Sequence, residues 1–161
     1  MIMILWFIRH AIAVERSDFA GPDLARPLTA AGRRQAREMF ERLARFRAGP
    51  TLIFASEAVR AWETADLLSV CYRLNRPVRT PLLNPGCTLK RLGVLLASKA
   101  GPAGHVALVG HEPDFSELIS RLTADRKQSL KMKKGALAEV ELKPGNRGIL
   151  KLLLPPDVMA S

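Results

Sequence analysis

The sequence predicts an α/β fold, in which helices cover both faces of a largely parallel β-sheet. Short apolar runs typical of buried strands alternate with stretches whose apolar residues recur at helical spacing. The length of 161 residues and a composition of 48% hydrophobic and 25% charged residues suit one globular domain over residues 1–161. Alternation from Ala136 to Leu142 predicts a half-buried strand that pairs with Ile149 to Leu154 as a hairpin, so we expect a mixed sheet.

The first half of the chain contains two predicted strands, each followed by a helix. Met1 to Ile8 is continuously apolar, as expected of a strand that is buried on both faces. After a loop rich in Asp, Gly and Pro, a helix is expected from about Thr29 until Gly49-Pro50 stops it. Thr51 to Ala55 is a second short buried strand, and Ser56 is a candidate cap for the helix that follows.

The second half predicts the remaining strands and helices before the hairpin. Pro77 to Leu83 is a candidate short strand, although its prolines weaken the prediction because proline cannot donate to a sheet ladder. Leucines at helical spacing predict a helix between Leu89 and Leu96, and His105 to Val109 is a further short strand. Pro113 suits the first turn of the helix that comes next.

The charge of the chain indicates anionic partners. The formal net charge is +10 and the sequence pI is about 10.4, which suits nucleic acid, phosphorylated protein and phosphate esters alike. The basic stretch from Arg121 to Lys134 has two interpretations, a solvated surface or a docking patch for an acidic partner. No aromatic residue interleaves these charges, so stacking on bases has no support and we expect no nucleic-acid partner.

Cysteine content and hydropathy predict a cytoplasmic location. Cys71 and Cys87 do not make a disulfide framework, so a reduced compartment is the default. No histidine lies near them at metal-ligand spacing, so we expect no zinc site. The apolar run from Met1 to Ile8 is too short to span a bilayer and no basic residue precedes it, so we expect neither a membrane span nor a standard signal peptide.

Three predicted strands end in residues suited to bind phosphate. Arg9-His10 follows the first strand, Ser56 and Arg60 follow the second, and His111 follows a later one. If these strands are parallel neighbours, the side chains converge at one sheet edge beside helix N-termini, which favour anions. Arginine binds phosphate oxygens in pairs, and neutral imidazole is a good nucleophile toward phosphorus. We therefore predict a metal-free phosphoryl-transfer site in which His10 attacks while Arg9, Arg60 and a protonated His111 hold the oxygens.

Four sequence blocks resemble, in order, the motifs of the histidine phosphatase superfamily, also called the phosphoglycerate mutase-like fold. They span most of residues 4 to 122 and are Ile8-Arg9-His10-Ala11; Arg26-Pro27-Leu28-Thr29 with Gly32 and Gln35-Ala36; Ser56 with Arg60-Ala61 and Thr64-Ala65; and Val109-Gly110-His111-Glu112-Pro113. The resemblance implies a three-layer α/β/α sandwich, with His10 as phospho-acceptor and Arg9, Arg60 and His111 as the phosphate pocket. Many members have Gly where this chain has Ala11, but Ala is common there in the small branch described next.

The middle of the chain lacks an acid that many members of the superfamily use. No Asp or Glu occurs from Leu67 through His111, whereas ester phosphatases of the superfamily carry a proton donor there because an alkoxide leaves poorly without a proton. Phosphohistidine breaks readily because imidazole leaves easily. The chain is therefore similar to the compact SixA-like phosphohistidine phosphatases, which lack this acid. The resemblance implies a phosphorylated protein as substrate, as in a phosphorelay, and no cofactor.

Two further residues and two alternative functions stay open at this point. Arg26 is a candidate phosphate or substrate ligand, and Glu112 is a candidate substrate contact or proton donor that the helix dipole would equally favour at a helix start. If Glu112 or water replaces the missing acid, the substrate is a small phosphate ester or anhydride. A non-catalytic phosphate- or polyanion-binding protein is the other alternative. The composition is compatible with a monomer, and we expect no role for His105.

Overall fold

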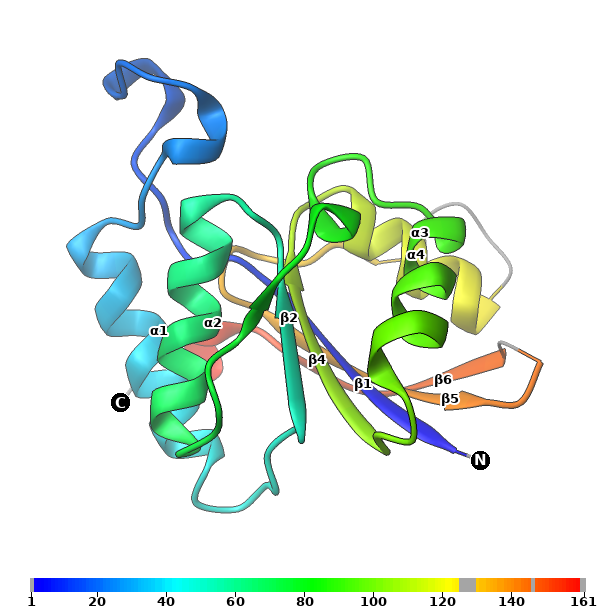
Figure 1. The fold of residues 1–161 in the computed structure, drawn as a ribbon. Helices are drawn as coiled ribbons and strands as arrows, with labels where there is room; N and C mark the ends of the chain where they lie inside the picture. Colours follow the sequence, from blue (N-terminus) through cyan, green and yellow to red (C-terminus); the bar gives the residue numbers. More distant parts are fainter. Residues whose placement is uncertain (1, 125–129, 146, 160–161) are drawn as a thin grey trace.

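A six-stranded sheet in the order β3-β2-β4-β1-β5-β6 forms the centre of the computed structural model, which describes residues 2–124, 130–145 and 147–159 (Figure 1). The strands are β1 (Met3–Arg9), β2 (Leu52–Ala55), β3 (Val78–Arg79), β4 (His105–Gly110), β5 (Leu137–Lys143) and β6 (Arg147–Leu154). β3, β2, β4 and β1 are parallel, whereas β5 is antiparallel to both β1 and β6. The predicted mixed, mostly parallel sheet is confirmed.

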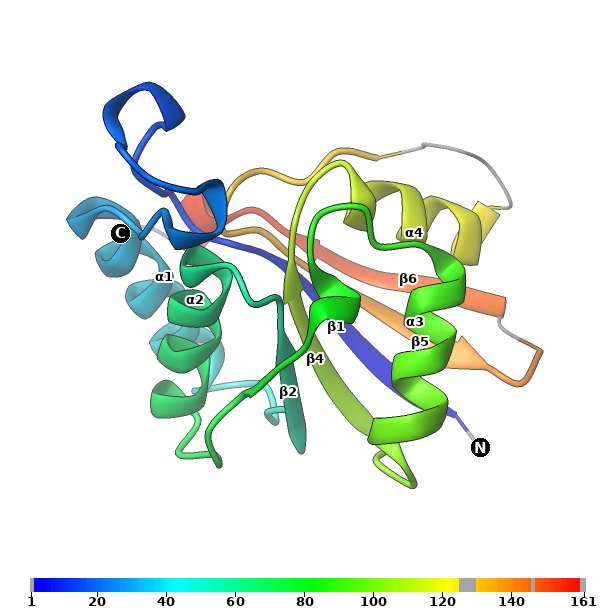
Figure 2. The same ribbon diagram turned by 45° about the horizontal axis from the view of Figure 1, so that its top comes forward.

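Helices cover both faces of the sheet and complete three layers. They are α1 (Ala30–Leu43), α2 (Val59–Cys71), α3 (Leu89–Leu95) and α4 (Asp114–Ala124). α1 and α2 lie on one face, and α3 and α4 on the other (Figure 1, Figure 2). Trp6 and Ile8 of β1 belong to the core beneath α1 and α2, whereas Leu5 and Phe7 belong to the other core, where Phe7 packs against Phe115 of α4. Both faces of β1 are covered, which explains its unbroken run of apolar residues.

Three parallel strands end side by side, as the sequence predicts. β1 pairs with β4 so that Arg9 lies opposite Gly110, and β2 pairs with β4 so that Ala55 lies opposite Val109. Backbone hydrogen bonds continue this register by one residue, because His10 N–H donates to Gly110 O at 3.0 Å and Ser56 N–H donates to Val109 O at 3.0 Å. The residues that follow β1, β2 and β4 therefore meet at one edge of the sheet.

Two local predictions need correction. Of the stretch Pro77 to Leu83, only Val78–Arg79 pairs in the sheet, and Pro81–Leu83 forms a 3-10 turn because proline cannot donate to a ladder. β5 is not half-buried, since nearly all of its residues are buried on both faces. Glu139, one of the polar residues of the alternating pattern, is only 8% exposed. It accepts hydrogen bonds from the Trp6 indole and the Arg47 guanidinium. The charged residue that alternation placed on an exposed face, Glu139, is therefore buried and paired with Arg47.

Within the described ranges, no helix is long and apolar enough to cross a membrane. The basic stretch from Arg121 to Lys134 is described only in part, and Arg126 and Lys127 lie outside the described residues. Of its described cations, Lys133 pairs with Asp157 at 2.9 Å and Lys134 pairs with Glu15 at 3.2 Å. These two lysines are thus partly neutralised by the protein itself.

Candidate active site

The loop that follows β1 is held in place by the two helices on one face of the sheet. Ala11 N–H donates to Thr64 Oγ1 of α2 at 3.1 Å, and Thr29 N–H donates to Ile12 O at 2.9 Å. Thr29 also caps α1 by accepting the N–H of Gly32 at 2.9 Å. A Cβ on Gly32 would lie 2.1 Å from Ile12 O, so only glycine lets the helix approach this closely. These contacts fix the backbone on which the first histidine stands.

His10 presents one unprotonated ring nitrogen. Its side chain is buried and only 7% exposed, and its Nδ1 lies 2.8 Å from Ala11 O. A carbonyl oxygen can only accept, so Nδ1 carries the proton and Nε2 keeps the lone pair. Burial lowers the pKa of His10 to about 3, and the charges of His111 and the nearby arginines lower it further, although the bond to Ala11 opposes them. The ring is therefore neutral at neutral pH.

His111 lies beside His10, with the two ring centroids 5.3 Å apart. It is 3% exposed, and its Nε2 lies 2.9 Å from Ser56 Oγ. Burial and then the charge of Arg60 lower the pKa of His111 to about 4. The protonated His111 expected from the sequence is therefore disfavoured here. Ser56 Oγ also accepts the N–H of Ala58 at 3.2 Å, but the helix-capping role expected of Ser56 is wrong, because the N-cap of α2 is Ala58 and no side chain caps this helix.

Hydrogen bonds to backbone carbonyls hold the guanidinium groups of Arg9 and Arg60 in place. Arg9 Nη1 donates to Met132 O at 2.7 Å, and Arg60 Nη1 donates to Asp23 O at 2.7 Å. Burial lowers the pKa of both guanidinium groups, but arginine stays charged in proteins. The Nε atoms of both are buried and have no partner among the described residues. Each guanidinium thus keeps a donor that the protein leaves unused.

Asp23 joins Arg60 to Arg26. Its Oδ2 accepts from Arg60 Nη2 at 2.8 Å, and its Oδ1 accepts from Arg26 Nε and Nη2 at 3.1 and 3.0 Å. Burial alone would raise the pKa of Asp23, but the bonds from Arg26 and the charge of Arg60 lower it. The sequence did not single out Asp23; the signal for it is an acid three residues before Arg26 in the Asp-, Gly- and Pro-rich loop.

Glu112 follows His111 and faces the start of α4. Its Oε1 accepts the Ser116 N–H at 3.0 Å, and its Oε2 accepts the Ser116 hydroxyl proton. This is the arrangement of a side chain that caps a helix, where a negative charge also complements the helix dipole. Of the two interpretations that the sequence left open, these contacts favour the structural one.

The sequence-predicted site residues line one cavity of about 360 Å³. They are Arg9, His10, Arg26, Arg60, His111 and Glu112. Asp23 and Lys134 line it too. No cluster of three or more His, Cys, Asp or Glu side chains that suits a metal ion occurs among the described residues. The cavity therefore brings together two imidazoles, several guanidinium groups and three carboxylates that already have partners, since Glu15 also lines it and pairs with Lys134.

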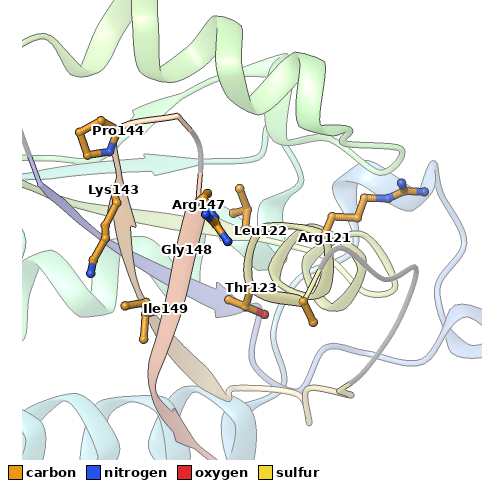
Figure 3. Close-up of a pocket in the computed structure, with 9 residues that line it drawn as sticks. Arg121, Leu122, Thr123, Lys143, Pro144, Arg147, Gly148 and Ile149 are labelled. Atoms are coloured by element: carbon orange, nitrogen blue, oxygen red, sulfur yellow. The ribbon is translucent and has the colours of Figure 1, made fainter.

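A larger cavity lies elsewhere in the molecule. Its volume is about 780 Å³, and it lies between the end of α4 and the β5–β6 hairpin, with Arg121, Lys143 and Arg147 among its lining residues. Figure 3 shows that these cationic side chains come from different elements and do not converge on one point. Among the described residues, neither a histidine nor a carboxylate lines this cavity. The large volume of this cavity does not by itself indicate a reaction site.

Comparisons with known proteins agree with this fold. A model of the histidine phosphatase superfamily (branch 1) matches residues 5–80. An uncharacterized protein of Picosynechococcus sp. is 34% identical over 116 residues, which cover 71% of this chain and 70% of that relative. The structure of the protein histidine phosphatase SixA complexed with tungstate superimposes with a TM-score of 0.86 at 23% identity, over 98% of this chain and 99% of SixA. The alpha-ribazole phosphatase of Shigella flexneri gives 0.73 at 20% identity, over 96% and 97%.

The architecture is thus the phosphoglycerate mutase-like α/β fold, in which phosphatases such as these are built. Residues 5–80 of the chain match the histidine phosphatase superfamily. The resemblance drawn from the sequence motifs is therefore confirmed. The structural neighbours include phosphatases with different substrates, so the fold does not by itself select a substrate.

Proposed function

We propose that this chain is a metal-independent phosphatase that carries the phosphoryl group on His10 and acts on phosphohistidine in proteins. The observation that carries the proposal is the state of His10. Its Nδ1 proton is committed to Ala11 O, so the lone pair of Nε2 is available. The ring is neutral while Arg9 and Arg60 lie beside it. A neutral nucleophile among fixed cations suits attack on an anionic phosphorus centre.

The reaction proceeds in two displacements. His10 Nε2 forms a bond to phosphorus as the bond between phosphorus and the leaving nitrogen breaks, and that nitrogen keeps the electron pair. Water then attacks the phosphorus, the electron pair of the N–P bond returns to Nε2, and both protons of the water leave on the dihydrogen phosphate product. The charge that spreads over the phosphoryl oxygens is stabilised by Arg9 and Arg60, whose anchored guanidinium groups need little reorganisation.

The carboxylates of the pocket favour a leaving group that needs no acid. The pKa of Asp23 is lowered by the bonds of Arg26 and the charge of Arg60 against the effect of burial, so Asp23 is a poor proton donor. Glu112 has both oxygens on Ser116. A phosphohistidine whose second ring nitrogen is protonated leaves as a neutral imidazole, so it needs no further proton from the enzyme. Arg26 is proposed to hold substrate indirectly, by keeping Asp23 and Arg60 in place.

Phosphate release tests this proposal. The substrates are a phosphohistidine-bearing protein domain, p-nitrophenyl phosphate and a phosphoserine peptide, each assayed with and without EDTA. We expect EDTA-resistant release from phosphohistidine, much slower release from the esters, and loss of both in His10→Ala. Release that needs a divalent ion, or that persists in His10→Ala, would contradict the proposed mechanism.

A small phosphate ester is the second candidate substrate, because the Glu112 carboxylate lines the same cavity as the histidines. Equal or faster turnover of the esters, combined with a large loss in Glu112→Gln, would favour it. We further propose a reducing, cytoplasmic setting for a single domain of residues 1–161, in keeping with the free thiols of Cys71 and Cys87. Cell fractionation tests the proposed location, and light scattering tests the oligomeric state.

A further inference from the structure

We propose that Ser56 and Asn84 are positioning residues that fix which ring nitrogen of His111 carries the proton, and that the opposite nitrogen gains a proton when a phosphoryl group binds. The first half of this inference concerns hydrogen bonds alone. The second half rests on the proposed function, because it assumes that a phosphoryl group enters the cavity that His111 lines.

The orientation of the Asn84 amide is determined by two contacts with Glu57. The backbone N–H of Glu57 can only donate, and it lies 2.9 Å from Asn84 Oδ1. The Glu57 carboxylate accepts, and its Oε2 lies 2.9 Å from Asn84 Nδ2. The amide oxygen must therefore face the backbone and the amide nitrogen must face the carboxylate. Any group that bonds to Asn84 Oδ1 has to be a donor.

Ser56 transmits this constraint to His111. Its hydroxyl has one proton, which it donates to Asn84 Oδ1 at 2.9 Å. The oxygen of that hydroxyl then has only acceptor capacity left, and it accepts the N–H of Ala58 at 3.2 Å. It must also accept from His111 Nε2, which lies 2.9 Å away. Nε2 of His111 therefore carries the proton, and Nδ1 holds the lone pair.

The two histidines of the cavity thus have opposite tautomers. His10 is protonated on Nδ1, whereas His111 is protonated on Nε2. Nδ1 of His111 has no hydrogen-bond partner among the described residues, and an unprotonated phosphoryl oxygen can only accept. His111 must therefore gain a proton on Nδ1 before that nitrogen can bond to a bound phosphoryl group.

Besides burial, charged groups from several elements set the pKa of His111 and therefore determine whether Nδ1 is protonated. Arg60 of α2, Arg9 of β1 and Arg26 of the preceding loop lower the pKa of His111, whereas Asp23 raises it. Neutral His10 adds no charge. An incoming phosphoryl dianion adds two negative charges to this balance and raises the pKa of His111. The hydrogen-bonded chain from Glu57 to His111 keeps the acceptor ready for that proton.

The tautomer can be measured directly by NMR of protein labelled with ¹⁵N in histidine. At neutral pH the wild type is expected to show an Nε2–H neutral ring for His111 and an Nδ1–H neutral ring for His10. Asn84→Ala frees the Ser56 hydroxyl to turn and donate to Nε2, so a population of Nδ1–H His111 is expected. Asn84→Asp keeps the accepting oxygen and is expected to keep the wild-type tautomer. Ser69→Ala, which removes another buried hydroxyl of α2, is the matched control.

Two additions to this experiment test the second half. Inorganic phosphate added to the wild type is expected to convert His111 to the imidazolium form. In Asn84→Ala, kcat/KM for phosphohistidine is expected to fall about tenfold at pH 7. It should also decline less steeply than the wild type as pH rises, because Nδ1–H His111 donates without taking up a proton.

The outcomes separate this inference from the proposed function. An Nδ1–H ring for His111 in the wild type, or an unchanged tautomer in both Asn84→Ala and Ser56→Ala, would overturn the positioning role even if phosphate release proceeds as proposed. A wild type that shows the expected tautomer but keeps His111 neutral with phosphate bound would overturn the proton uptake. Absence of any phosphatase activity would leave the tautomer measurement valid and would count against the proposed function alone.

Discussion

Two basic cavities at opposite ends of the fold show what separates a reaction site from a charged surface. The larger one, of about 780 Å³, has Arg121, Lys143 and Arg147 on its wall, and their side chains do not converge on one point. The smaller one, of about 360 Å³, has Arg60 bonded to Asp23 through two nitrogens, and a neutral His10 between its cations. Anchored cations beside an unprotonated nitrogen supply electrostatic preorganisation, whereas exposed cations that do not converge supply only attraction.

The largest effect should come from the nucleophile. His10→Ala removes the atom that would form the bond to phosphorus, so we expect kcat to fall by about 10⁴-fold or more. The measurement is phosphate release from a phosphohistidine protein. His105→Gln is the matched control, since His105 is also shielded from solvent and packs against Trp6 outside the cavity. Comparable losses in both variants would show that buried histidines matter for folding and not for chemistry.

The next effect should come from an anchored cation. Arg60→Lys keeps the charge but loses the paired contacts with Asp23, so we expect kcat/KM to fall by about 10²-fold. Steady-state kinetics on the same substrate measure this loss. If Arg60→Lys retained full activity, charge alone would suffice and the contrast between the two cavities would disappear.

The buried histidines should also make the protein sensitive to acid. Their pKa values of about 3 and about 4 lie below the value near 6.5 of an unfolded chain. The stability they contribute is therefore complete above pH 6.5 and is lost as pH falls toward 4. We expect each of His10 and His111 to cost about 3 kcal/mol of unfolding free energy over this range. Urea unfolding at pH 7 and pH 4 tests it, and His10→Gln should reduce the pH dependence.

The smallest effect should come from the larger cavity. Arg121→Ala combined with Arg147→Ala removes two exposed cations that line this cavity. We expect less than a twofold change in kcat/KM on p-nitrophenyl phosphate and in stability. A tenfold loss on that small substrate would mean that the larger cavity contributes to the reaction, and the distinction drawn above would fail.

Strand ends could be predicted from the sequence because apolar runs stop at charged pairs. The run that leads to Arg9-His10 is buried on both faces, and its register with β4 places His111 beside it. Contacts made by side chains across loops could not be predicted. Asp23 reaches Arg60 only through the conformation of its loop. Glu139 is buried because Arg47, distant in sequence, covers it, and the alternating pattern of β5 gave no sign of this.

The protonation states of the histidines also lay beyond the sequence. The motif places His10 and His111 at strand ends, but the tautomer of each depends on a particular acceptor. Ala11 O serves His10 and Ser56 Oγ serves His111. Ser56 does not cap α2 as expected, and its hydroxyl instead bonds to Asn84 and His111, which the sequence did not predict. Residue types therefore predict where a site forms, and hydrogen-bond geometry decides what each group can do there.

The most direct test of the central claim is to trap the phosphorylated enzyme. The protein would be mixed with a phosphohistidine-bearing domain, quenched in base within one turnover, and analysed by peptide mass spectrometry and ³¹P NMR. We predict a phosphoryl group on Nε2 of His10, absent from His10→Ala. A phosphoryl group on Nδ1, on His111 or on any other residue would contradict the account. So would release of phosphate with no enzyme-bound intermediate.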